Sequence, residues 1–363
     1  CTPYSYNFNY GFQWQAAKDT MVEAVYVGSL GRGLISNVET NFPDPTVMNE
    51  QLTQFGFTYP DCARPLAACV GGSTPYDPNG TPTGALQLYS NVSNGYSNSH
   101  QLQLTVDKRF SKHFAFRAAY TLAKTTDISS GYRSRSFEYT DPLDPNLDRG
   151  LADFDTPQRL VISGLWELPF DRGIHSDGIL KKIAGGWQAN AIASFQKGNP
   201  FTLYSNSNSS QQDNYLDRPD IIGPIQYYNP RTPQDFTAAS ASCLGNDVAG
   251  GKFWFNPASF NCTGPFNNDG SINPAGVPVF TYGTLSRNIL RGPGINNWDI
   301  SIIKNTPLGG ETRSLQFRAE FFNAFNHTQF SNPDNQGGSG TFGQVTLTRV
   351  DPRIIQFGLK LYF

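Results

Sequence analysis

The stretch Tyr4–Ala16, YSYNFNYGFQWQA, places an aromatic or apolar side chain at every second position. Small or uncharged polar side chains fill the positions between them: Ser5, Asn7, Asn9, Gly11, Gln13 and Gln15. Because a period of two puts successive side chains on opposite sides of a sheet, the stretch predicts a β-strand with one apolar and one polar face. The rest of the chain must show what covers the apolar face.

The composition of the 363-residue chain favours many strands joined by long, turn-rich loops, with 35 glycines, 25 prolines and 13% aromatic residues. No apolar run approaches the roughly 20 residues that a membrane helix needs. Strands of an outer-membrane barrel carry only about half of their residues as apolar, so a membrane protein remains possible. The net charge of −2 gives no electrostatic case for a nucleic-acid partner.

The same alternation recurs along the chain and gives nine predicted strands in total. Eight charged side chains in these strands fall on the non-aromatic face: Glu23, Asp107, Arg117, Glu167, Asp299, Arg318, Glu320 and Lys360. A soluble β-sandwich, with the apolar face in its core, and a barrel, with that face in lipid, both explain this pattern. The further predicted strands lie near 20–29, 100–110, 113–124, 159–168, 187–196, 298–304, 315–323 and 353–363.

The lengths of the connections favour the barrel. Turns near 17–19, 110–112 and 305–311 and a medium one near 169–185 alternate with long loops near 30–97, 125–157, 198–295 and 324–352. This rhythm is typical of a barrel with short periplasmic turns and long extracellular loops. We therefore predict an all-β, antiparallel transmembrane β-barrel in the outer membrane of a Gram-negative cell, in contact with outer-membrane lipid.

The last predicted strand, RIIQFGLKLYF, supports this architecture most strongly. Ile355, Phe357, Leu359, Leu361 and Phe363 share one face of it. A terminal phenylalanine in register with four apolar residues is similar to the C-terminal strand of bacterial outer-membrane proteins.

Four phrases of the sequence resemble the C-terminal barrel of TonB-dependent receptors, in particular the Oar-like group that carries a carboxypeptidase-regulatory-like domain. They are SNGYSNSHQLQLTVDKRFSKHFAFRAAYTLAKTTD at 93–127, DFDTPQRLVISGLWELPF at 153–170, RNILRGPGINNWDISIIKNTPL at 287–308 and LQFRAEFFNAFNHTQFSNP at 315–333. WFNPASF at 254–260 and RPDIIG at 218–223 match recurrent loop phrases of that group.

The resemblance implies a 22-stranded barrel, of which residues 1–363 supply the last nine strands, the first of them running toward the periplasm. It places the plug and the N-terminal domains outside this chain, together with the segment that contacts the TonB complex. The implied function is binding and energised uptake of an unidentified nutrient. An outer-membrane adhesin or export-associated barrel without active uptake, and a secreted glycan-binding β-sandwich, are the alternatives.

Four of the five cysteines predict local disulfides. Cys62 with Cys69, and Cys243 with Cys262, each lie within one predicted loop, which suits an oxidising compartment. Free thiols are the alternative, and Cys1 is left over.

Aromatic side chains in the long loops are candidates for contact with an extracellular ligand, because rings supply contact area at low entropic cost. We assign this role to Tyr132, Phe137, Tyr139 and Trp254, with packing among the loops as the alternative. On the polar strand face, Arg117, Arg318 and Glu320 would line the lumen as a charge ladder toward the plug or as paired wall residues.

No catalytic motif is present, and we expect no enzymatic activity and no cofactor. The four histidines lack metal-ligand spacing. An acidic run at 141–155 could hold calcium, although its spacing does not match the EF-hand pattern and its prolines favour a rigid turn. Within it, Asp155 and Arg159 are a candidate pair that ties the loop to the following strand. The acidic residues are Asp141, Asp144, Asp148, Asp153 and Asp155.

Overall fold

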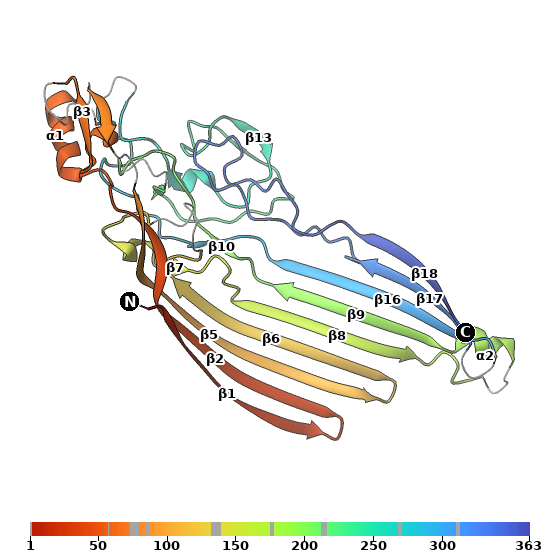
Figure 1. The fold of residues 1–363 in the computed structure, drawn as a ribbon. Coiled ribbons are helices and arrows are strands. Elements are labelled where there is room, and N and C mark those ends of the chain that lie inside the picture. Colours follow the sequence, from red (N-terminus) through yellow and green to blue (C-terminus); the bar gives the residue numbers. More distant parts are fainter. Residues whose placement is uncertain are drawn as a thin grey trace.

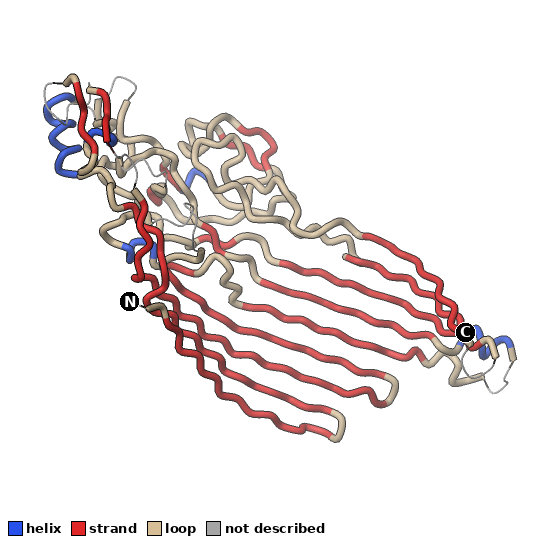
Figure 2. The backbone as a smooth tube through the Cα atoms, viewed as in Figure 1, coloured by secondary structure: helices blue, strands red, loops and turns tan. Residues whose placement is uncertain are grey.

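A computed structural model describes residues 2–56, 58–72, 80–84, 88–131, 139–174, 178–211, 216–267, 271–309 and 313–363. Strands dominate the described chain (Figure 2). The long strands are β1 (Tyr4–Ala17), β2 (Thr20–Glu39), β5 (Tyr89–Ser111), β6 (Phe114–Asp127), β8 (Gln158–Leu168), β9 (Trp187–Gln196), β16 (Ile295–Pro307), β17 (Ser314–Phe322) and β18 (Ile354–Tyr362). The short strands are β3 (Ala67–Val70), β4 (Thr81–Gly84), β7 (Gly150–Leu151), β10 (Pro200–Phe201), β11 (Asp220–Ile221), β12 (Gln234–Phe236), β13 (Val248–Gly251), β14 (Phe260–Asn261) and β15 (Leu290–Arg291). The helices are α1 (Pro45–Phe55), α2 (Ile179–Ala184) and the short 3₁₀ turns Pro60–Cys62, Pro145–Asp148 and Pro257–Ser259.

All nine predicted strands form, and they pair antiparallel in chain order: β1-β2-β5-β6-β8-β9-β16-β17-β18. The two-residue strand β7 adds to β6, and β1 and β18 form the open edges of this sheet. Every other sheet in the described residues has only two strands and lies in the loops. A sandwich needs a second large sheet facing the first. The β-sandwich alternative is therefore wrong.

The strand register joins the apolar residues of all nine strands into one continuous face. Tyr10 lies opposite Tyr26, Tyr26 opposite Leu102, and Leu102 opposite Leu122. The pattern continues to the other edge, where Phe357 is 68% exposed. Many large side chains of this band are exposed, and an apolar area of such extent marks a surface that contacts another apolar phase, such as lipid.

Long loops gather at one end of the sheet and short turns at the other (Figure 1). We call these the loop end and the turn end. Residues 40–88, 128–157, 197–294 and 323–353 connect strands at the loop end, as the sequence predicted. The N-terminus lies at the loop end, and the C-terminus lies beside α2 at the turn end (Figure 1).

Strands β2 and β5 extend much further than the sequence predicted, because half of each was expected to belong to a loop. They have 20 and 23 residues and stay paired up to Glu39 opposite Tyr89. At about 3.3 Å per residue, β2 is about 66 Å long, roughly twice a bilayer's hydrocarbon core. The outer half of the hairpin therefore stands above the apolar band, where alternation is no longer required. For that reason the outer half of the hairpin is rich in Ser, Asn and Gly, a composition that is typical of loops.

The loops have a hydrophobic core of their own. Phe253, Phe255, Phe260 and Phe342 are fully buried in it, and the Phe255 ring meets the rings of Phe260 and Phe342 edge to face at 5.5 Å. These side chains come from two loops that are separated by strands β16 and β17. The long loops therefore form a packed layer above the sheet.

The two cysteine pairs suggested by the sequence are both joined as disulfides. Cys243–Cys262 lies inside the loop core, and Cys62–Cys69 links a 3₁₀ turn to β3. Neither α-helix within the described ranges has the length and hydrophobicity to cross a bilayer.

Candidate functional site

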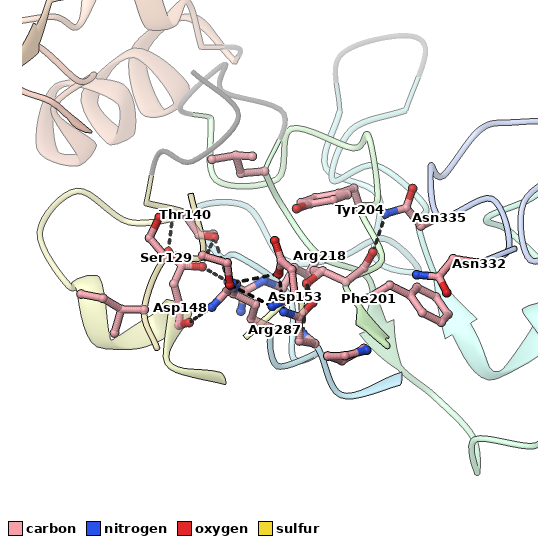
Figure 3. A pocket seen from close by; sticks show the side chains of 16 residues that line it. Ser129, Thr140, Asp148, Asp153, Phe201, Tyr204, Arg218, Arg287, Asn332 and Asn335 are labelled. Carbon is pink, nitrogen blue, oxygen red and sulfur yellow. Dashed lines mark hydrogen bonds and ion pairs between the residues drawn. The ribbon is translucent and has the colours of Figure 1, made fainter. Parts of the chain in front are cut away.

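A polar cavity of about 290 Å³ opens between three of the long loops, where they fold over the loop end of the sheet (Figure 3). Loop 128–157 supplies Thr140, Asp148 and Asp153 to its lining, and loop 197–294 supplies both arginines. Loop 323–353 closes it with two asparagines. The labelled lining residues are Ser129, Thr140, Asp148, Asp153, Phe201, Tyr204, Arg218, Arg287, Asn332 and Asn335.

The first of the two arginines, Arg218, forms a buried ion pair with Asp148. The Asp148 carboxylate also accepts hydrogen bonds from the backbone N–H of Thr140 at 2.6 Å and from the Thr140 hydroxyl at 2.7 Å. Burial lowers the pKa of Arg218, and the neighbouring Asp148 carboxylate opposes that shift. This cluster fastens two loops together across 70 residues of sequence.

The second arginine, Arg287, lies between two carboxylates. Its guanidinium is 2.6 Å from Asp127 at the end of β6 and 2.9 Å from Asp153. It also donates to the Ser130 hydroxyl at 2.8 Å. Burial disfavours its charged form, but the attraction of Asp127 outweighs that cost and raises the pKa of Arg287. Arg287 therefore stays charged and ties the loop layer to the sheet.

Some polar groups at the cavity are not used within the described part of the chain. The Nε of Arg218 is buried without a hydrogen-bond partner there. Burial also raises the pKa of the Tyr204 phenol, which stays neutral and able to donate. Two arginines face two lining aspartates, so the lining has no net charge. With its amides and hydroxyls, it suits an uncharged polar ligand better than a free anion.

The acidic run does not gather into a metal site. Asp148 and Asp153 bind the arginines of the cavity, while Asp141 and Asp144 each accept a backbone N–H two residues later in a local turn. Among the described residues no group of three metal-ligating side chains occurs. The calcium hypothesis thus finds no ligand cluster here.

The predicted tether between Asp155 and Arg159 has a different partner. Asp155 is buried, pairs with Arg291 at 2.5 Å and accepts the backbone N–H of Thr125 at 2.6 Å. Thr125 is in β6 of the large sheet, which we call the wall, and Arg291 is in β15 of the loop layer. The Asp155 carboxylate therefore joins the wall to the loop layer. Asp155 does fasten the loop, but both predicted partners were wrong: the cation lies 136 residues away in sequence, and the strand is β6 and not the one that follows the loop.

The structure places the described aromatic candidates inside the loop layer. Tyr139 is 2% exposed, with its hydroxyl 2.6 Å from Ser36 Oγ. Trp254 packs on the loop core and donates its indole N–H to the Arg291 carbonyl at 2.7 Å. Tyr139 is therefore a packing residue, whereas Trp254 is only half-buried and its contact with a ligand stays a prediction. Tyr132 and Phe137 lie outside the described residues.

The three lumenal charges do not form a continuous ladder. Arg117 in β6 lies opposite Asp107, whereas Arg318 and Glu320 pair with each other at 3.7 Å in β17. Strands β8, β9 and β16 separate the two places. All three lie on the polar face of the sheet, and their contact with a plug stays a prediction.

Sequence reasoning missed the residues that form the cavity, above all Arg218, Arg287 and Tyr204. Arg218 opens RPDIIG and Arg287 opens RNILRG, two phrases noted only for their family resemblance. The available signal was general only: both are arginines in long loops that also carry many carboxylates. Such arginines need carboxylate partners when loops pack.

The model of the outer membrane beta barrel domain family matches residues 1–356. The solved outer membrane transporter YddB from Escherichia coli aligns with all of this chain at 10% identity and a TM-score of 0.48. This chain spans 33% of that protein, about a third of its length. No curated protein matches the chain. The family match covers nearly the whole sequence. Membership in this family explains why one face of the sheet is apolar, since that face contacts lipid, and why the long loops lie together at one end. The chain belongs to the outer membrane β-barrel domain family and lies in the outer membrane.

Proposed function

We propose that this chain is the C-terminal part of the barrel of a TonB-dependent transporter, which binds a nutrient at its outer loops and takes it up with energy from the inner membrane. The observation that carries the proposal is the loop layer: three long loops fold together above the wall and enclose a polar cavity. A simple pore has no need to close its entrance in this way. The polar inner face, with Arg318 and Glu320, supplies a watery wall for a plug.

The direction of the strands agrees with this proposal. In a 22-stranded barrel, the fourteenth strand runs toward the periplasm when the last strand ends there. Here β1 runs from the loop end to the turn end, and β18 ends at the turn end (Figure 1). Nine strands in this order therefore fit as the last nine of 22, with the preceding strands pairing at the edges of β1 and β18.

A conductance measurement on the full-length protein tests gating. In planar bilayers, the full-length protein should pass little steady ionic current, and a variant without the plug should pass a large one. Purified periplasmic TonB domain should bind the full-length protein and should not bind a variant that lacks the N-terminal TonB-contacting segment. Steady conductance of the full-length protein, or absence of TonB binding, would refute active uptake and support the adhesin or export-associated barrel.

We place ligand contact in the cavity and assign it an uncharged, hydroxyl-rich ligand, on the basis of its balanced charges and its amide and hydroxyl side chains. Calorimetry of the full-length protein with maltose and with inorganic phosphate compares the two chemistries. Tyr204→Phe should weaken binding of the sugar about tenfold, the effect of one lost hydrogen bond. Tyr6→Phe, on the apolar face, is the matched control. Tighter binding of phosphate than of maltose would overturn the ligand class.

A further inference from the structure

The turn between β8 and β9 contains a short helix, α2, whose apolar side is uncovered. Ile179, Leu180 and Ile183 are 77%, 68% and 61% exposed. At 100° per residue these three side chains fall within an arc of about 100° on the helix surface, and Lys182 lies about 60° outside that arc. Three large aliphatic side chains on one side of a six-residue helix need an apolar environment.

The helix is fastened to the lipid-facing side of the wall. Trp187 donates its indole N–H to the carbonyl of Ile183 at 2.9 Å, and Lys304 donates to the carbonyl of Lys182 at 2.6 Å. Lys304 also donates to the carbonyl of Gly185. Trp187 and Lys304 are cross-strand partners on the apolar face of the sheet. The last carbonyls of α2 are thus satisfied by side chains that project from the outer surface of the barrel.

The chain after α2 fixes this position. Gly186 has φ +72°, and a Cβ atom there would come within 2.3 Å of the Asn305 carbonyl oxygen. The Asn305 N–H in turn donates to the Gly186 carbonyl at 2.9 Å. The turn therefore approaches β16 as closely as glycine permits, which holds α2 beside the wall at the turn end (Figure 1).

We propose that α2 is a phospholipid-binding element, lying in the plane of the inner leaflet of the outer membrane. Ile179, Leu180 and Ile183 enter the acyl-chain boundary, and Lys182 contacts lipid phosphate groups. Two observations select lipid as the occupant. Trp187 and Lys304 fasten the helix to the apolar face of the sheet, which also carries the exposed Trp166. Its flanking lysine also complements the negative charge of phospholipid headgroups.

The test uses the full-length protein in vesicles of phosphatidylethanolamine and phosphatidylglycerol. An environment-sensitive fluorophore is attached at Leu180→Cys, and at Lys18→Cys in the β1–β2 turn as the matched control. Phospholipids brominated on their acyl chains should quench the label at position 180 several-fold more than the label at position 18. The label at position 180 should also emit at shorter wavelength.

Two outcomes would overturn the proposal. Equal quenching at both positions would mean that α2 stays in water. A shift to shorter wavelength without quenching by brominated lipid would mean that protein, and not lipid, covers the helix. Heat-modifiable migration in electrophoresis checks that both variants have folded barrels. Ile179→Ser with Ile183→Ser, added to the labelled protein, should reduce quenching at position 180 and leave this migration unchanged.

Discussion

Replacing Asp148 with alanine should loosen the loop layer and leave the barrel wall intact. The substitution removes the carboxylate that pairs with Arg218 and accepts two hydrogen bonds from Thr140. Both charged side chains are almost completely buried, at 3% and 7% exposure. Removing one member of a buried pair costs about 3–5 kcal/mol, because the remaining charge stays uncompensated in a medium of low dielectric constant.

Hydrogen exchange followed by mass spectrometry measures this cost locally. At 1.4 kcal/mol per factor of ten, protection of the amides in 139–151 and 216–220 should fall by roughly 100- to 5,000-fold in Asp148→Ala, provided these segments open without the wall. Peptides from β5 and β6 should keep their protection. Asp141→Ala is the matched control, since that carboxylate serves only a local turn and its loss should cost about 1 kcal/mol.

A second variant separates charge from packing. Asp148→Leu combined with Arg218→Met removes both charges and keeps much of the volume, so it should recover most of the protection lost in Asp148→Ala. Protection that is unchanged in Asp148→Ala would refute the reasoning that this pair holds the loops together. Protection in the double variant as low as in the single one would show that the unpaired charge is not the cause.

Three further variants test contacts in the loop layer and at α2. Cys243→Ala with Cys262→Ala opens a link across 19 residues and should destabilise the loop core by about 3 kcal/mol, seen as faster proteolysis of the loops. Burial opposes ionisation of Asp334, but hydroxyl hydrogen bonds, the first from Ser339, outweigh it and lower the pKa of Asp334. Its contribution to stability is thus present above the unfolded pKa of about 4 and is lost as the pH falls through the lower folded pKa, so Asp334→Asn should flatten the acid dependence of exchange there. Lys304→Met removes the hydrogen bond from Lys304 to the Lys182 carbonyl of α2. Proteolysis of the β8–β9 turn should become faster, while the long loops should be cleaved at the same rate as before.

The strands of the wall could be predicted from the sequence because the pattern that specifies each strand lies within that strand. Each strand needs only that every second side chain be apolar, and Tyr4–Ala16 shows this without reference to any other segment. The register then follows from short turns such as the one at 112–113 between β5 and β6. The outer halves of β2 and β5 did not follow this rule, since no lipid faces them.

The cavity could not be predicted because its contacts are remote and chemically ordinary. Arg218 meets Asp148 across 70 residues, and Arg287 meets Asp127 across 160. Nothing near either arginine in the sequence selects one carboxylate among the many in the loops. The ligand-contact prediction for Tyr139 failed for a related reason. An aromatic residue that packs inside a loop and one that binds a ligand occur in the same kind of sequence, so the sequence does not distinguish them.

The unbroken apolar face places different limits on evolutionary change in the two halves of the molecule. Deleting Phe116, near the start of β6, would shift all later residues of that strand to the opposite side and move Arg117 into the hydrocarbon. The same deletion in loop 197–294 alters local packing only. Insertions and deletions among related genes should therefore concentrate in the loops. In this way a lineage can acquire a new ligand specificity while it inherits the membrane-spanning wall unchanged.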